Sequence, residues 1–315
     1  MKKIIAAIGA GIGIAIIVGV MILQQTMPVQ TELQEAVISQ PESKIKVIAS
    51  FYPLYEFSKN VGGDRAQVSV FTPIGVEPHD WEPSTGDLIA LQDADVFVYN
   101  GGGMEPFLGK LLDSGEYSDV LFVDSTQNLG LITHEDEHDH PSDPHVWLDP
   151  ISAKNQVMMI KDALIKVDAQ NAQYYEDNAN AYSAKLDGLD SKIKSELASC
   201  AKDTIVPFHN AFSYFGARYG IHIHALSGIA PESEVTASDL KETIDFIREN
   251  QIKIVFAEEL VDPKLAQILA DEAGAQILLL SPLEGITPEE QENGISYLDK
   301  MEENLKNIKT ALECT

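Results

Sequence analysis

Histidine is the residue type in this chain whose placement suggests chemistry. The chain holds eight histidines, and four of them lie in the short stretch Thr133–Pro150, THEDEHDHPSDPHVWLDP, interleaved with carboxylates. Outside it, His79 and His209 each follow a proline by one or two residues, as His145 does inside it. Neutral imidazole nitrogens bind zinc and other first-row transition metals. The spacing therefore raises the question whether these histidines form one metal site or several.

The elements that must position the histidines alternate between strands and helices. Apolar runs such as KIKVIASFYPL and ADVFVYNGGG are typical of buried strands, and they alternate with helical segments both before residue 150 and after residue 200. Between these halves, Ser152–Val167 and Ala169–Ser199 are helical in pattern, and the second would be about 46 Å long at 1.5 Å per residue. Apolar residues recur along this second segment at spacings of four and three, which predicts one apolar stripe: Tyr175, Ala179, Tyr182, Leu186, Leu189, Ile193 and Leu197. A last helix is expected over Glu289–Leu312. We predict an α/β protein with two lobes, each a mostly parallel sheet flanked by helices, joined by one long rigid helix.

This pattern divides the chain into five parts. They are an N-terminal hydrophobic segment (1–23), a polar flexible tether (24–43), an N-terminal α/β lobe (44–150), a helical segment that contains the long helix (151–200) and a C-terminal α/β lobe (201–315). Ile4–Leu23 is uncharged and long enough to span a bilayer, and Lys2 and Lys3 would keep the N-terminus in the cytoplasm. We expect an uncleaved membrane anchor, with a cleaved signal peptide as the alternative, and the rest of the chain outside the cytoplasm.

Composition excludes some partners. Asp and Glu number 49 against 22 Lys and Arg, for a net charge of −27, so the surface repels nucleic acid and anionic lipid head groups. Outside the cytoplasm, Cys200 and Cys314 could form one disulfide or remain two thiols. They are too few to form a zinc site by themselves.

Three histidines occupy equivalent places in the predicted sheets. In open parallel sheets, ligands bind beyond the carboxyl ends of the strands. His79, His145 and His209 all lie in such loops, the first two in the N-terminal lobe and the third in the C-terminal lobe. One such histidine alone would more simply be a hydrogen-bonded loop residue. Three of them, split across two lobes, predict one shared metal site in the cleft between the lobes.

Five stretches carry a resemblance to a known family. GVEPHDWEPSTGDL, DPHVWLDP, FHNAFSYFGARYGI, SGIAPESEVTASDL and IVFAEE, in this order, resemble the metal-binding receptors of ABC importers of the zinc/manganese class. The resemblance covers about Lys44–Leu312. It implies two parallel-sheet lobes, a rigid linking helix that limits hinge bending, and one metal ion in the interlobe cleft. The family's ligand histidines correspond to His79, His145 and His209.

One position departs from the family's pattern. Members that bind through four side chains have an Asp where this chain has Ser281, and members selective for manganese usually have a carboxylate at the position of His209. Three imidazoles and no obvious fourth carboxylate favour zinc over the oxygen-preferring manganese. The fourth ligand is left open between water and the neighbouring Glu284. Glu258 and Glu259 end a strand of the second lobe, where either could orient a ligand imidazole.

The stretch THEDEHDH is distinct from DPHVWLDP under this interpretation. Receptors of the family that handle zinc often carry a His-rich, acidic loop just before the second ligand. His134, His138 and His140 lie among four carboxylates in such a segment. We expect a weak, exposed secondary zinc site there, with a solvated acidic loop as the alternative.

The resemblance implies a function. We expect an extracytoplasmic, high-affinity zinc receptor, monomeric and not an enzyme, that delivers its ion to an ABC permease in the membrane. A manganese or iron receptor of the same class is one alternative. Two others are a zinc-dependent hydrolase, in which three histidines hold a water-bearing zinc, and a metal-stabilised adhesin. The chain contains no HExxH motif and no carboxylate clearly placed as a general base, which disfavours the hydrolase.

Overall fold

The computed structural model describes residues 44–133 and 142–315. All of these residues belong to one unit of the chain, Ser43–Thr315. The predicted membrane anchor (Ile4–Leu23) and the predicted tether (24–43) lie outside the described residues. Among the helices that are described, none is both long and apolar enough to cross a membrane.

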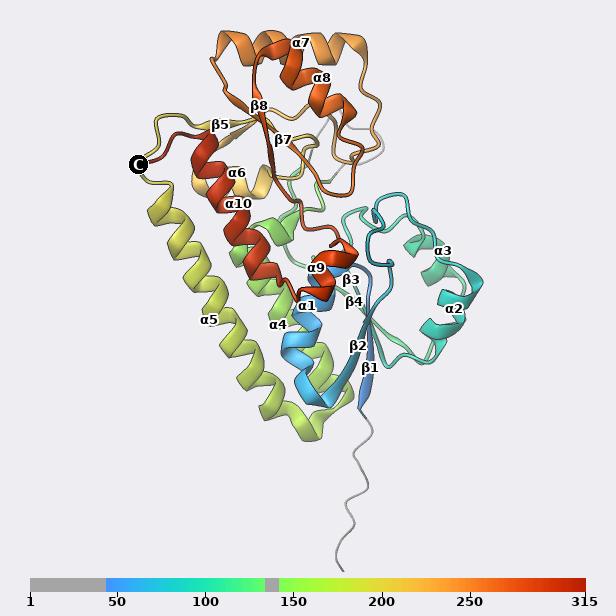
Figure 1. Ribbon diagram of the computed structural model, residues 1–315. Helices are drawn as coiled ribbons and strands as arrows, with labels where there is room; N and C mark the ends of the chain where they lie inside the picture. The colour runs from blue at the N-terminus through green and yellow to red at the C-terminus, as the bar shows by residue number, and fades with distance from the viewer. Residues whose placement is uncertain (1–43, 134–141) are drawn as a thin grey trace, which may run out of the picture. The chain divides into compact units, whose positions relative to one another are not determined.

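The N-terminal half is built on a parallel sheet of four strands in the order β2-β1-β3-β4. The strands are β1 (Ile45–Ala49), β2 (Ala66–Val70), β3 (Val96–Tyr99) and β4 (Leu121–Asp124), and the helices between them are α1 (Tyr52–Gly62), α2 (Thr85–Gln92) and α3 (Leu108–Asp113). Because side chains alternate along a strand, Val47 and Ala49 join the apolar cluster under α1, whereas Ile48 joins the cluster under α2 and α3. Figure 1 shows α1 and the α2–α3 pair on opposite sides of this sheet.

Two consecutive helices follow the first sheet. They are α4 (Pro150–Val167) and α5 (Ala172–Glu196), separated by the short 3-10 helix Ala169–Asn171. The apolar stripe predicted for the long helix lies along α5, where Tyr175, Ala179, Tyr182, Leu186, Leu189 and Ile193 are buried. Leu197, just beyond the end of the helix, is partly buried. The predicted helix, Ala169–Ser199, is longer than α5, because its first turn is a 3-10 helix and the α-helix ends at Glu196. Its 25 residues span about 38 Å.

The C-terminal half contains two parallel strand pairs, β5-β6 and β7-β8. The strands are β5 (Thr204–Ile205), β6 (His222–Ile223), β7 (Ile254–Ala257) and β8 (Gln276–Leu279), and the helices are α6 (Ser213–Tyr219), α7 (Ala237–Glu249), α8 (Lys264–Ala273), α9 (Pro288–Glu292) and α10 (Tyr297–Ala311). The backbone N–H of Phe256 donates to the carbonyl of Val206 at 2.9 Å, which joins the two pairs. The predicted fold class is confirmed, whereas the domain boundaries near residues 150 and 200 stay a prediction.

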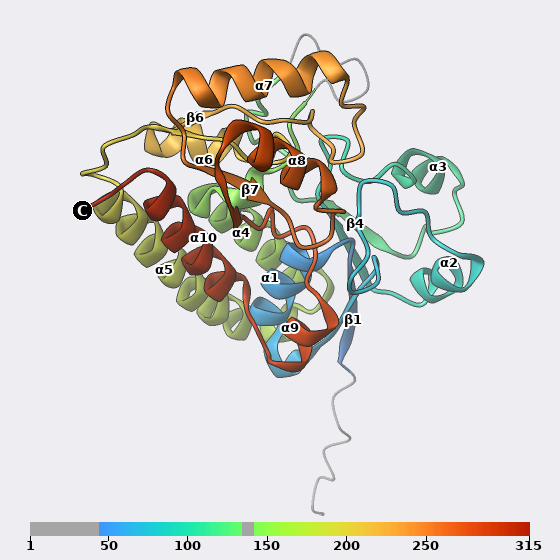
Figure 2. The same cartoon turned by 45° about the horizontal axis from the view of Figure 1, so that its top comes forward.

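The end of the chain differs from its prediction. The sequence pattern predicted one terminal helix over Glu289–Leu312, which is wrong: the structure has α9 and α10. Gly294 takes φ 67° between them, and Ser296 then caps α10 with Asp299 in a capping box. Both views show α10 alongside α5 (Figures 1 and 2), and the ion pair between Lys309 and Glu196 at 2.8 Å joins the two helices.

A disulfide between Cys200 and Cys314 ties the end of α5 to the C-terminus. The alternative of two free thiols is therefore wrong. The bond closes a loop with a sequence separation of 114 residues, which restricts the unfolded chain strongly. We expect the double variant Cys200→Ser/Cys314→Ser to lose about 2–5 kcal/mol of unfolding free energy. Urea denaturation of both proteins measures this difference, and an unchanged midpoint would contradict the expectation.

Candidate metal centre

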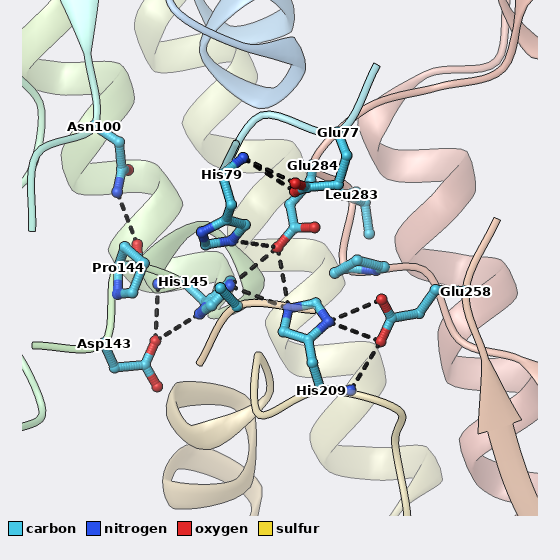
Figure 3. A network of polar contacts seen from close by, with 12 residues as sticks. Glu77, His79, Asn100, Asp143, Pro144, His145, His209, Glu258, Leu283 and Glu284 are labelled. Carbon is cyan, nitrogen blue, oxygen red and sulfur yellow. Dashed lines mark hydrogen bonds and ion pairs between the residues drawn. The ribbon is translucent and has the colours of Figure 1, made fainter. Parts of the chain in front are cut away.

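Three histidines and one glutamate converge in a buried cluster. The ligand atoms of His79, His145, His209 and Glu284 all lie within 4.8 Å of one another, and all four residues are buried (Figure 3). Oε1 of Glu284 is 3.2 Å from Nε2 of His79, 3.0 Å from Nε2 of His145 and 3.2 Å from Nε2 of His209. The Nε2 atoms of His145 and His209 are 3.3 Å apart. The three histidines singled out in the sequence thus lie together, and Glu284 stands at the position that was left open.

These separations suit one small cation bound by four ligands. Zinc binds His nitrogen at about 2.0–2.1 Å and carboxylate oxygen at about 2.0–2.2 Å, so the corners of a zinc tetrahedron are about 3.3 Å apart. The three carboxylate-to-imidazole distances and the distance between His145 and His209 all fall between 3.0 and 3.3 Å, and the other two pairs of donor atoms lie within 4.8 Å. Four of the six separations therefore match the spacing that four-coordinate zinc requires.

Each of the four residues follows the carboxyl end of a parallel strand. His79 lies between β2 and α2, His145 lies between β4 and α4, and His209 follows β5. Glu284 follows β8 in the same way, and this position is the signal by which it could have been assigned from sequence. The topology brings the loops of both halves to one place.

Carboxylates hold two of the imidazoles by the ring nitrogen that faces away from the cluster. Oδ1 of Asp143 lies 2.8 Å from Nδ1 of His145 and also accepts its backbone N–H at 2.9 Å. Both oxygens of Glu258 lie 2.8 Å from Nδ1 of His209, and Oε1 accepts the backbone N–H of the same residue at 3.1 Å. A proton on Nδ1 leaves Nε2 as the lone-pair donor toward the centre. Of the two carboxylates considered from sequence, Glu258 therefore orients an imidazole.

The remaining histidine is fixed through its backbone. The N–H of His79 donates to both carboxylate oxygens of Glu77, each at 3.1 Å. Burial and the negative charge of Glu284 raise the pKa of Glu77 to about 7. Glu77 is therefore partly protonated at neutral pH, and it carries less negative charge beside the imidazoles than an ordinary carboxylate would.

The charge of the neighbouring carboxylates changes how the ligands bind protons. Burial alone would lower the pKa of His145, but the hydrogen bonds and charges of Asp143 and Glu284 outweigh burial and raise it. The same balance, with Glu258 in place of Asp143, raises the pKa of His209 well above its usual value. Burial alone would raise the pKa of Glu284, but the neighbouring imidazoles hold it well below the usual range. The cluster is built to hold positive charge, whether of protons or of a metal ion.

Buried hydrogen bonds connect the loop of His145 to the rest of the protein. Nδ2 of Asn100 donates to the carbonyl of Pro144 at 2.8 Å, and Asn100 is itself held by Nε2 of Gln156 at 2.9 Å. On the other side, Nε1 of the buried Trp147 donates to the carbonyl of Pro282 at 2.8 Å. The loop of His145 is thus bonded to the turn that carries Glu284.

His134, His138 and His140 lie outside the described residues. The residues on either side of them are described, and they pair with each other. Thr133 and Ser142 form an antiparallel bridge, and the N–H of Asp143 donates to the carbonyl of Ile132 at 2.8 Å. The two ends of this segment therefore meet next to Asp143, which orients His145.

A family model matches most of the chain. Residues 47–311 match the model for ZnuA, described as zinc-uptake complex component A, periplasmic. The chain belongs to this family. Its membership in the ZnuA family confirms the predicted resemblance to metal-binding receptors of ABC importers.

Individual relatives of the ZnuA family extend this match. The high-affinity zinc uptake system protein ZnuA of Bacillus subtilis (strain 168) is 36% identical over 280 residues, which are 85% of this chain and 88% of that protein. The zinc-binding lipoprotein AdcA of Streptococcus pneumoniae (serotype 4) is 36% identical over 281 residues, which are 86% of this chain and 56% of AdcA. The chain thus spans most of the Bacillus relative and about half of the AdcA relative.

Solved structures of related proteins have the same fold. The Zn(II)-bound ZnuA-like domain of Streptococcus pneumoniae AdcA superposes with a TM-score of 0.76 at 36% identity, covering 86% of this chain and 100% of that domain. The laminin-binding protein Lmb of Streptococcus agalactiae, described as a bifunctional protein with adhesin and metal transporting activity, gives a TM-score of 0.79 at 32% identity. It covers 86% of this chain and 100% of the Lmb chain.

Proposed function

We propose that this protein is an extracytoplasmic receptor that binds one zinc ion tightly and delivers it to an ABC permease for uptake. The observation that carries the proposal is the buried cluster in which the carboxylate oxygen of Glu284 lies 3.0–3.2 Å from three imidazole Nε2 atoms. The names of its relatives, a zinc uptake protein and a zinc-binding lipoprotein, support the choice of ion.

The donor set favours zinc over the other metals of the class. Three nitrogens and one oxygen at tetrahedral spacing match the coordination that zinc adopts in proteins. Manganese prefers six oxygen-rich ligands in octahedral geometry, and here a fully buried imidazole, His209, stands where a manganese receptor usually has a carboxylate. We therefore propose zinc as the cargo.

The same cluster favours binding over hydrolysis. A catalytic zinc keeps one position open for water, beside three protein ligands. In this centre Oε1 of Glu284 lies close to all three imidazoles, so a fourth protein ligand takes that position. We propose that the site stores and releases the ion without carrying out a reaction.

We propose that Ile4–Leu23 anchors the receptor in the membrane and that 24–43 tethers the folded part, which acts as a monomer outside the cytoplasm. Membrane fractionation and size-exclusion chromatography measure these two properties.

Competitive titration of the purified protein with zinc, manganese and iron tests the choice of ion. We expect one tight equivalent of zinc, bound at least about 100-fold more tightly than manganese, in line with the general order of metal affinities. Equal affinity for manganese, or no tight equivalent of zinc, would contradict the proposal. Chelators of different zinc affinity serve as competitors, so that zinc dissociation constants well below micromolar can be measured.

We propose that the tight site does not depend on His134, His138 and His140, which would form a weaker site of their own. Because Thr133 and Ser142 pair directly, residues 134–141 can be replaced by a two-residue Asn-Gly hairpin turn. We expect this variant to keep the tight equivalent with an affinity within about threefold of the unmodified protein and to lose the weak additional zinc. Calorimetric titration measures both, and loss of the tight equivalent would instead assign these histidines to the main site.

A further inference from the structure

Glu284 sits on a turn with an unusual backbone. Leu283, directly before it, has φ 58° and is fully buried. A bulky residue without glycine's freedom adopts this left-handed region only when its surroundings hold it there. The turn Ser281–Glu284 therefore needs contacts that keep it in this conformation.

Helix α10 supplies the first of these contacts. Oδ1 of Asn304 accepts the backbone N–H of Ser281 at 2.9 Å, and Nδ2 of Asn304 donates to the backbone carbonyl of the same residue at 2.6 Å. Asn304 and Ser281 are both buried, so water does not compete for these bonds. One side chain thus satisfies both backbone polar groups at the start of the turn.

The hydroxyl of Ser281 supplies the second contact. Its Oγ accepts the backbone N–H of Leu283 at 3.1 Å and donates to Oε1 of Glu259. In family members that bind through four side chains, an Asp ligand occupies the position of Ser281. Here the hydroxyl is used inside the turn, and the ligand position belongs to Glu284.

A buried lysine completes the network. Nζ of Lys300, on α10, lies 2.9 Å from Oε1 of Glu259 and 2.6 Å from Oε1 of Glu290, on α9. Lys300 is 1% exposed, so its charge requires both carboxylates. The lysine in turn holds Glu259 in the position where its carboxylate accepts the hydrogen bond from the hydroxyl of Ser281.

We infer that Asn304, Lys300 and Glu259 are positioning residues that hold the Ser281–Glu284 turn so that Glu284 reaches the three imidazoles. Glu258 and Glu259, adjacent at the end of β7, then serve two different ligands: Glu258 holds His209 directly, and Glu259 holds the turn of Glu284 through Ser281. This inference rests on the proposed function, because it states how that site's fourth ligand is kept in place.

A double-mutant cycle tests whether the network acts through Glu284. We expect Asn304→Leu to raise the zinc dissociation constant about 10- to 100-fold, the range typical of residues that orient metal ligands. In a Glu284→Gln background the same substitution should change the dissociation constant less than about threefold, since the ligand it positions is already impaired. Ser281→Ala, a smaller change in the same network, should give the same pattern if Asn304→Leu folds poorly.

Controls separate positioning from general loss of stability. Ile308→Val, in the same helix and buried, should lower the thermal midpoint of the metal-free protein without changing zinc affinity. Equal weakening by Asn304→Leu in both backgrounds, or no weakening in either, would overturn the inference while leaving the proposed function intact. Weak zinc binding by the unsubstituted protein would instead contradict the proposed function, whatever the variants do.

Discussion

Replacing His209 with alanine should abolish tight zinc binding. Zinc binding to a structural site has a free energy of about 10–16 kcal/mol in total. One of four ligands therefore contributes roughly 3–4 kcal/mol, which corresponds to on the order of 10²- to 10³-fold in affinity. The loss is expected to be at the upper end, because His209 is fully buried and its removal leaves Glu258 without the imidazole that it holds. A chelator competition assay on the purified variant measures the change directly.

A matched control is available in the same half of the protein. His222, on β6, is exposed and lies 4.0 Å from Asp203. His222→Ala should leave zinc affinity within about threefold of the original value, because the residue is exposed and is not one of the four clustered residues. Full tight binding by the His209→Ala variant would remove this residue from the site.

Zinc affinity should fall steeply as the pH is lowered. An imidazole must lose its proton to bind a metal, and Asp143, Glu258 and Glu284 raise the pKa of His145 and of His209. Proton competition therefore begins at a higher pH than for an ordinary histidine, whose pKa is about 6.5. Glu284, with its lowered pKa, stays ionised over this range and adds no competition.

The expected size of this effect follows from the number of protons displaced. For each proton released on binding, apparent zinc affinity weakens about tenfold per pH unit below the pKa of that group. Two imidazoles with raised pKa values therefore give on the order of 10³- to 10⁴-fold weaker binding at pH 5 than at pH 7. Zinc affinity measured at half-unit steps, together with calorimetric proton release in two buffers, provides the test. An affinity that stays constant down to pH 5 is incompatible with imidazole ligands.

The meeting of the three histidines was predictable because their positions follow from topology. All the strands expected from apolar runs are present in the expected order, and parallel pairing brings their carboxyl ends together. His79, His145 and His209 need only lie in the loops after those strands to meet. Local patterns are enough for this, since the loops begin at strand ends that the sequence marks clearly.

Glu284 was harder to predict because its position depends on distant residues. It reaches the cluster only through a turn in which Leu283 takes a left-handed conformation, and the side chains that hold this turn come from α9, α10 and the end of β7. Its place after β8 makes Glu284 a candidate, but no local pattern around Ser281 signals the turn that brings it to the imidazoles. The break between α9 and α10 was missed although its signals are local: Gly294 follows the first helix, and Ser296 and Asp299 form the capping box of the second.

A crystal structure of the zinc-loaded protein, with the ion located by anomalous scattering at the zinc absorption edge, would show directly which residues bind it. We predict one fully occupied ion bonded at about 2.0–2.2 Å to Nε2 of His79, His145 and His209 and to an oxygen of Glu284. An ion bound elsewhere, or one in which water replaces Glu284, would contradict it.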